Sequence, residues 1–238
     1  MNKEVTKIIN KVTLAERTVH IKLLGDSITH GVGGTGFEQN GETIVEGYAR
    51  NKDGYCWAKQ FKDYMESQYD CIVTNNACKG TKIEFIIDNF EKLVDEDDDI
   101  IICTIGTNNR HQNKKETEKI HTKKEHMQEF YNNIIKLNNM FKDSKKDVIF
   151  AANIPASVEN EKRDDEEVIR IFHMCDVNDL YMKASVECGF PFISIYNAFM
   201  NYCRMKDISI DSLLKDGLHP NDKGYDVIFT LMLKELGI

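Results

Sequence analysis

Five short runs rich in valine and isoleucine recur along the chain, and longer stretches with helical periodicity separate them. The runs are Val19–Gly25, Cys71–Asn75, Asp99–Ile105, Val148–Asn153 and Pro191–Tyr196. Continuous apolar runs of this length are typical of strands buried on both faces, and their alternation with helices indicates a parallel sheet. The order is one helix followed by five β-α units. Right-handed crossovers then predict an α/β fold, a three-layer αβα sandwich around a five-stranded parallel sheet.

The stretches between the runs carry apolar residues at every third or fourth position, as amphipathic helices do. We expect an opening helix within residues 1–18, one from about Glu166 to Cys188 that Gly189 caps, and a final helix from about Lys223 to Leu236. With 238 residues, 41% of them apolar, and no linker-like stretch, the chain is expected to form a single domain over residues 1–238. Residues 1–18 are its N-terminal helical extension.

The charge pattern argues against two classes of partner. The formal net charge is −8, and lysines are interleaved with acidic residues instead of forming a basic stripe, so neither nucleic acid nor an anionic membrane is an expected partner. The start of the chain lacks the apolar core of a secretory signal, and no 18 apolar residues run together, which favours a soluble, cytoplasmic protein. Seven cysteines without a C-x-x-C pair are interpreted as reduced core residues, and no cysteine and histidine cluster has the spacing of a metal site.

The first apolar run ends in Gly25-Asp26-Ser27, which places a serine on the turn directly after a buried strand. Ligands of open α/β sheets bind beyond the carboxyl ends of the strands, so this is where a nucleophile would project. Considered alone, Ser27 could equally be the N-cap of the next helix.

Asp216 and His219 lie three residues apart just before the last predicted helix. A serine hydroxyl needs a neutral imidazole to accept its proton and a carboxylate to orient that imidazole, and this pair fits both roles. The alternative is a surface turn in which the aspartate only caps the helix.

Two further strand ends offer hydrogen-bond donors for an oxyanion. The third strand is followed by Gly106-Thr107-Asn108-Asn109, and the side-chain N–H of Asn108 could stabilise the tetrahedral intermediate of acyl transfer. The second strand is followed by the small-residue turn 75–81, whose backbone N–H groups could supply another donor.

These four segments, in this order, resemble the blocks of the SGNH, or GDSL-like, hydrolase family over about residues 19 to 230. The resemblance implies the flavodoxin-like SGNH hydrolase fold, with Ser27 as nucleophile, His219 as general base and Asp216 as its orienting acid. It also implies an oxyanion hole made by the backbone N–H of Ser27, the backbone N–H of Ala77 and the side chain of Asn108.

The sequence departs from the family at two positions. Ala77 stands where the family usually has the glycine that donates to the oxyanion, and Asn109 replaces an aspartate that supports the loop. Neither change removes a residue of the triad. The motif G-x-S-x-G, which marks the other common serine hydrolase fold, is not present in the sequence.

The segment from His30 to Gly54 is long for a loop between a strand and a helix, and loops of this kind are often lids or binding loops. We expect Phe37, Tyr48 and Tyr55 either to lie near an acyl or sugar pocket or to pack the loop onto the domain. The acidic run 95–99 is interpreted as a solvated loop, with a calcium site as the less favoured alternative.

These features together predict a serine esterase that works through an acyl-serine intermediate and needs no cofactor and no metal. Its partner would be a small-molecule or glycan ester, and polar, glycine-rich loops favour a carbohydrate O-acetyl esterase. The alternatives are a lipolytic esterase, lysophospholipase or thioesterase, an O-acetyltransferase, and a non-catalytic carbohydrate-binding relative.

Overall fold

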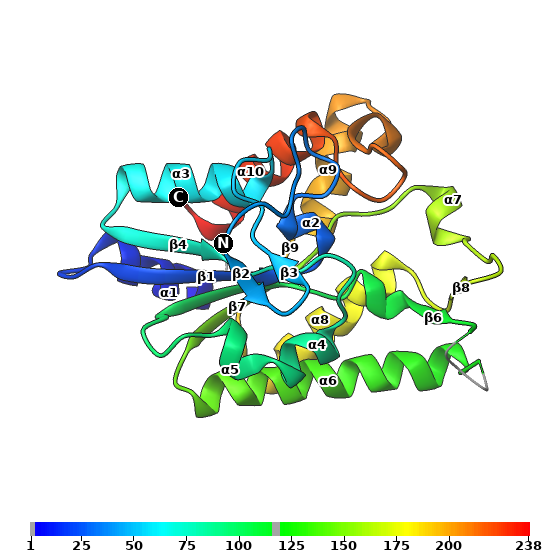
Figure 1. Cartoon of the computed structure of the whole chain (residues 1–238), viewed down its shortest axis with the longest axis horizontal. Helices are drawn as coiled ribbons and strands as arrows, with labels where there is room; N and C mark the ends of the chain where they lie inside the picture. The colour runs from blue at the N-terminus through cyan, green and yellow to red at the C-terminus, as the bar shows by residue number, and fades with distance from the viewer. Residues whose placement is uncertain (1–2, 116–119) are drawn as a thin grey trace.

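A five-stranded sheet lies at the centre of the computed structural model, which describes residues 3–115 and 120–238 (Figure 1). Its strands lie in the order β4 (Cys71–Asn75), β1 (Val19–Gly25), β5 (Ile100–Thr104), β7 (Asp147–Ala152) and β9 (Phe192–Ser194). Every neighbouring pair is parallel. Counted along the sequence, this is the flavodoxin-like order 2-1-3-4-5, so the predicted α/β fold is confirmed.

Helices cover both faces of the sheet and complete the three layers (Figure 1). One face packs against α1 (Lys3–Thr13), α3 (Trp57–Gln68), α9 (Ile195–Lys206) and α10 (Asp222–Leu236). The other packs against α4 (Ile83–Asp88), α5 (Phe90–Leu93), α6 (Lys123–Asp143) and α8 (Met174–Cys188). Residues of β5 alternate between the two cores, with Ile100 and Ile102 in the first and Ile101 and Cys103 in the second. This alternation explains why the run is apolar throughout.

Short elements lie beyond the carboxyl ends of the strands. They are α2 (Ser27–His30), the 3₁₀ turns η1 (Asn108–Arg110) and η2 (Ile210–Leu213), and α7 (Val158–Glu161). Two small antiparallel pairs, which the apolar pattern did not predict, join β2 (Thr43–Val45) to β3 (Tyr48–Ala49) and β6 (His111–Asn113) to β8 (Val168–Arg170). These elements surround the carboxyl ends of the central strands, where the candidate site residues lie.

The helix expected from about Glu166 begins at Met174 instead. The carboxylate of Asp165 accepts the backbone N–H groups of Glu167 and Val168 at 2.9 and 2.8 Å, and this turn leads into β8. The helix α8 begins where Asp176 accepts the backbone N–H of His173 at 2.8 Å. Side-chain hydrogen bonds at the start of the segment therefore override its helical periodicity.

The last strand was expected to reach Tyr196 but ends at Ser194. The hydroxyl of Ser194 accepts the backbone N–H of Asn197 at 3.1 Å, so it caps α9, which the apolar pattern did not predict. The final helix α10 and the left-handed cap at Gly189, with φ 71°, are confirmed.

The N-terminal helix is part of the core. The buried residues of α1 are Val5, Ile8, Ile9 and Val12, and they join the same apolar cluster as α10. All seven cysteines lie within the described ranges as free thiols, five of them buried. Across the described residues, no helix is long and apolar enough to cross a bilayer.

The acidic run before β5 is organised around a buried cation. The side chain of Lys22 is 2% exposed, and its ammonium lies 2.6 Å from Asp95 and 3.4 Å from Asp98. Burial raises the pKa of Asp98, although the nearby ammonium opposes that shift. The run therefore neutralises Lys22 at the end of the sheet opposite to Ser27.

Candidate active site

Ser27 is the first residue of α2, directly after β1. The N-cap of this helix is Asp26, whose carboxylate accepts the backbone N–H of Ile28 at 3.1 Å. The capping role that the sequence left open for Ser27 thus belongs to its neighbour, and the serine hydroxyl is available for another partner.

That partner is His219, which joins two segments that are far apart in the sequence. Its Nε2 lies 2.9 Å from the hydroxyl of Ser27, and its Nδ1 lies 2.7 Å from a carboxylate oxygen of Asp216. The second oxygen of Asp216 accepts the backbone N–H of His219 at 2.8 Å. The structure therefore brings the three predicted residues together in the order hydroxyl, imidazole and carboxylate.

The electrostatics keep Asp216 ionised. Burial raises its pKa, but hydrogen bonds from the side chain and backbone of His219 and from the backbone of Leu218 outweigh this, so the pKa lies below its ordinary value. A carboxylate that stays charged holds the Nδ1–H of the imidazole and leaves Nε2 as the acceptor toward the serine hydroxyl.

Asp26, which follows β1, forms hydrogen bonds with residues that follow β5 and β7. Its carboxylate accepts the side-chain N–H of Asn153, which follows β7, at 3.0 Å, and the backbone N–H of Thr107, which follows β5, at 3.3 Å. Burial raises the pKa of Asp26, and the hydrogen bonds from Thr107 and Ile28 oppose that shift. Sequence reasoning missed Asn153, although its place at the end of the fourth strand marked it as a candidate.

Asn108 lies in η1 on the same edge of the sheet. One hydrogen of its side-chain amide is donated to the carbonyl oxygen of Thr81 at 2.9 Å, which leaves a second hydrogen for a ligand. The neighbouring Asn109 accepts the backbone N–H of Ile83 at 3.0 Å and donates to Glu84 at 2.9 Å. Asn109 therefore braces the loop, as its position in the sequence pattern suggested.

Ala77 is not placed to donate to an oxyanion, which corrects the sequence-based assignment. It is fully buried, and its backbone N–H already donates to the side-chain oxygen of Asn75 at 3.0 Å. The N–H of Lys79 donates to Nδ1 of His30 at 3.1 Å. The next residue, Gly80, is exposed, and its backbone N–H has no acceptor among the described residues.

Comparison of the sequence with models of known protein families gives a match. The model of the GDSL-like lipase/acylhydrolase family matches residues 23–227, which includes all three residues of the candidate triad. The chain belongs to this family. A comparison with curated protein sequences finds no match.

This GDSL-like acylhydrolase is similar in structure to several solved hydrolases. Axe2, an acetylxylan esterase from Geobacillus stearothermophilus, is 19% identical with a TM-score of 0.64, over 93% of this chain and 95% of that one. LAE5, an alpha/beta hydrolase enzyme from the metagenome of Lake Arreo in Spain, is 18% identical with a TM-score of 0.65, over 93% and 96% of the two chains. Two Axe2 structures are catalytic mutants in which an aspartate or a histidine three positions later is replaced by alanine.

The loop from His30 to Gly54 lies folded against the domain of this acylhydrolase. The phenol of Tyr55 donates to Asp226 of α10, and the ring of Tyr48 contacts that of Phe85 at 5.1 Å between centroids. Phe37 lies edge-on to His30 at 5.2 Å. The rings of Phe37 and Tyr48 thus have packing partners and the hydroxyl of Tyr55 is bonded to α10, which supports the second of the two interpretations left open by the sequence.

Glycine at position 33 lets this loop approach the histidine of the GDSL-like site closely. A Cβ at Gly33 would lie 2.9 Å from the Cβ of His219 and 2.4 Å from the carbonyl oxygen of Pro220. Its φ of 103° is also unfavourable for other residues. The loop therefore supports one side of the imidazole.

Two groups of described residues in this acylhydrolase have ligand atoms close enough to share a metal ion. They are His121, His126 and Glu129 at the start of α6, and Asp95, Asp97 and Asp98 beside Lys22. Neither group includes a residue of the candidate triad, and acyl transfer by a serine requires no metal.

Proposed function

We propose that this protein is a serine esterase that removes acetyl groups from carbohydrate through an acyl-serine intermediate. The observation that carries the proposal is the pair of contacts made by His219, 2.9 Å to Ser27 and 2.7 Å to Asp216. Structural similarity to an acetylxylan esterase, and the matching spacing of its catalytic aspartate and histidine, add support.

In the proposed reaction, Nε2 of His219 accepts the proton of Ser27 while the serine oxygen attacks the carbonyl carbon of the ester. The tetrahedral intermediate collapses as the imidazolium protonates the leaving sugar oxygen, which leaves acetyl-Ser27. Water then attacks the acyl carbon, with His219 again as base, and acetate leaves. Asp216 keeps the imidazole in the required tautomer throughout.

The negative oxygen of each tetrahedral intermediate needs fixed donors. We assign this role to the backbone N–H of Ser27, the side chain of Asn108 and the backbone N–H of Gly80, which replaces Ala77 in the assignment. Gly80 is exposed, and its backbone N–H has no acceptor in the part of the chain that the structure describes, so this N–H is available to a ligand. Losing one such donor typically slows acyl transfer by about a hundredfold or more.

The test is hydrolysis of p-nitrophenyl esters from acetate to palmitate, measured with the wild type and with Ser27→Ala. We expect turnover to be highest on acetate and to disappear in the variant. A preference for long acyl groups would favour the lipolytic esterase or thioesterase alternative. No turnover on any ester, or turnover that survives Ser27→Ala, would rule out the proposed function.

A second measurement distinguishes a hydrolase from an O-acetyltransferase that uses the same triad. Acetylated xylo-oligosaccharides are incubated with an unacetylated acceptor sugar, and the products are analysed by mass spectrometry. We expect free acetate to account for all acetyl groups lost from the donor. Acetylated acceptor as the main product would contradict the hydrolase assignment.

A further inference from the structure

Two cationic side chains meet beside the proposed oxyanion donor Asn108. Lys82 follows Thr81, whose carbonyl oxygen accepts the side-chain N–H of Asn108 at 2.9 Å. The ammonium of Lys82 donates to the carbonyl oxygen of His111 at 3.2 Å, and the guanidinium of Arg170 contacts Nδ1 of the same histidine at 2.7 Å. Because His111 lies three residues after Asn108, both cations belong to the edge of the sheet that carries the site.

Neither cation has an acidic partner among the residues that the structure describes. Among the described residues, the guanidinium of Arg170 hydrogen-bonds only to His111 and to Asn160, at 3.1 Å to the side-chain oxygen of Asn160 and 3.3 Å to its carbonyl oxygen. Both Lys82 and Arg170 are half-buried. A partly desolvated cation without a counterion is costly, so such a pair is more simply explained by an anion that arrives from outside.

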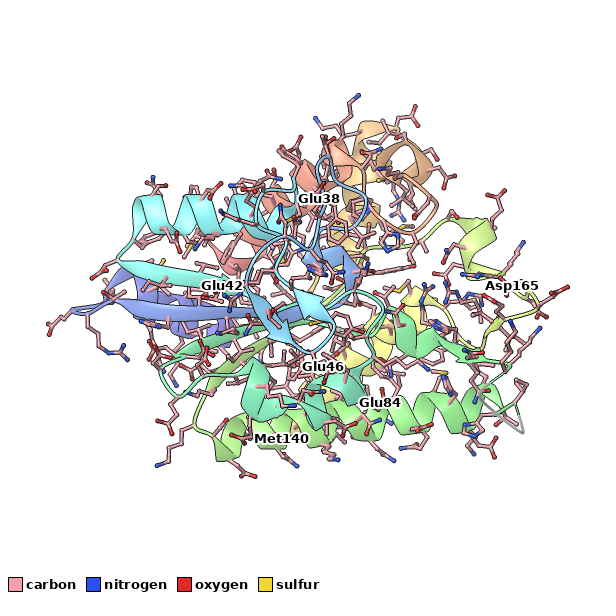
Figure 2. The ribbon with its side chains drawn as sticks, viewed as in Figure 1. Glu38, Glu42, Glu46, Glu84, Met140 and Asp165 are labelled. Atoms are coloured by element: carbon pink, nitrogen blue, oxygen red, sulfur yellow. The ribbon has the colours of Figure 1, made fainter. Side chains whose placement is uncertain are left out.

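The acidic residues nearby are engaged with other cations. Glu161 pairs with the fully buried guanidinium of Arg110 at 2.6 Å. Asp165 pairs with Arg163 at 2.5 Å, and its side chain points away from the body of the molecule at the tip of the loop before β8 (Figure 2). Positive charge therefore remains in excess around His111.

The ionisation of His111 reflects this excess. Burial lowers its pKa to about 3, and the positive charges of Arg170, Lys82, Arg110 and Arg163 act in the same direction. The imidazole consequently stays neutral and accepts a hydrogen bond from Arg170. Burial, followed by the charges of Arg110 and Arg163, lowers the pKa of Arg170 to about 10, although the carboxylates of Glu161 and Asp165 oppose part of that shift. The guanidinium therefore stays charged at neutral pH.

We propose that Arg170 and Lys82 bind an anionic oxyacid group, a carboxylate or a sulfate, on the sugar that carries the ester. A guanidinium presents two parallel N–H donors that match the oxygens of such a group, and a lysine adds a compact positive charge. This inference rests on the proposed esterase function and narrows its substrate to esters of acidic sugars.

The experiment measures inhibition of p-nitrophenyl acetate hydrolysis by galacturonate, galactose 6-sulfate and galactose, which differ at a single position. We expect the inhibition constant of at least one acidic sugar to be about tenfold or more below that of galactose, as hydrogen bonds to charged groups imply. Arg170→Gln and Lys82→Gln should each remove most of this difference without changing inhibition by galactose. Lys115→Gln, in which an exposed lysine paired with Glu167 is changed, is the matched control and should behave as the wild type.

The preferred acidic sugar identifies the group, because galacturonate alone indicates a carboxylate site and galactose 6-sulfate alone a sulfate site. Equal inhibition by all three sugars, with p-nitrophenyl acetate still hydrolysed, would overturn the anion site and leave the esterase intact. If the wild type hydrolyses no ester, calorimetric titration with the same three sugars tests the anion site separately. If Arg170→Gln does not fold, Lys82→Gln and a rise of the wild-type inhibition constant with salt decide the question.

Discussion

His30 connects the helix of the nucleophile to the turn that carries Gly80. It is 1% exposed, its Nδ1 accepts the backbone N–H of Lys79 at 3.1 Å, and its Nε2 lies 2.9 Å from the carbonyl oxygen of Ala49. Burial lowers its pKa, so the imidazole is neutral, with its proton on Nε2. We therefore expect His30 to be a positioning residue for the amide of Gly80.

Two substitutions of His30 test separately its hydrogen bond with Lys79 and its hydrogen bond with Ala49. Asparagine places an acceptor near Nδ1 and keeps the bond from Lys79, whereas glutamine places a donor near Nε2 and keeps only the bond to Ala49. We expect His30→Gln to lower kcat on p-nitrophenyl acetate about tenfold, a fraction of the effect of deleting an oxyanion donor, with little change in KM. His30→Asn should recover most of that loss, and equal losses in both variants would mean that the role is only structural.

Gly33 offers a second test at the residue scale. Gly33→Ala should lower kcat, because its Cβ would displace His219, 2.9 Å away, from the hydroxyl of Ser27. Gly36→Ala is the matched control, since it also has a positive φ, of 74°, but its Cβ would meet only one atom, 3.9 Å away. Both variants should lose about 1 kcal/mol of unfolding free energy from backbone strain, and Gly33→Ala should lose more because its Cβ would also clash with the carbonyl oxygen of Pro220. Comparable kcat values in the two variants would contradict a supporting role for Gly33.

The contacts of His219 with Ser27 and Asp216 could be predicted from the sequence, because each motif is local and lies next to a recognisable strand or helix. The backbone donor to the oxyanion in the turn 75–81 could not be assigned from the sequence. In the turn 75–81, the side-chain oxygen of Asn75 accepts the backbone N–H of Ala77, and Nδ1 of His30 accepts the backbone N–H of Lys79. These two hydrogen bonds determine which backbone N–H of the turn remains free. His30 lies more than forty residues away in the sequence, so no local pattern reveals the contact.

The edge strand β4 is protected by one helix. The ammonium of Lys62 donates to the carbonyl oxygen of Val73 at 2.9 Å, and the carboxylate of Glu66 accepts the N–H of Val73 at 2.8 Å. Both side chains belong to α3 and also pair with each other at 2.6 Å. They occupy the backbone groups with which another strand would pair, and such edges are a common route to aggregation.

We expect Glu66→Ala to aggregate faster than the wild type at elevated temperature, since it frees the N–H of Val73. Asp63→Ala is the control because Asp63 pairs with Lys59 one turn earlier on α3, at 2.7 Å. Light scattering during incubation a few degrees below the melting temperature of each protein measures the difference. Equal aggregation rates would show that this ion pair does not protect the edge.

Elements were predictable where burial dictates their composition. The five central strands are largely apolar because helices cover both faces of the sheet. By contrast, β6 and β8 have three residues each, and they pair His111 with Arg170 across the ladder. The beginning of α8 depends on Asp165 and Asp176, whose side chains choose between a turn and a helix. Whether residues 166–173 form a turn or a helix depends on the tertiary structure, because the spacing of Val168 and Ile171 is compatible with both.

The stability of the whole molecule should depend on pH through His111. Its pKa is about 3 in the folded protein and near 6.5 in an unfolded chain. As the pH falls below about 6.5, the unfolded chain binds a proton that the folded protein does not, so stability falls by at most about 1.4 kcal/mol per pH unit down to the folded pKa.

Urea unfolding at pH 7 and pH 4.5 should therefore show a larger loss of stability for the wild type than for His111→Asn, which keeps an acceptor for Arg170 but cannot be protonated. Carboxylates contribute to the pH dependence of both proteins and cancel in the comparison. Parallel losses would mean that His111 is protonated about equally in the folded and unfolded states.

The contact between Ser27 and His219 spans 192 positions of the sequence. Contacts between such distant segments close large loops at an entropic cost, which slows folding. We therefore expect this contact to form late in refolding. After dilution from urea, we expect the far-ultraviolet circular dichroism signal, which reports secondary structure, to recover before the hydrolysis of p-nitrophenyl acetate does. If the proposed esterase function holds, recovery of hydrolysis marks the point in refolding at which the segment of Ser27 and the segment of His219 have come together.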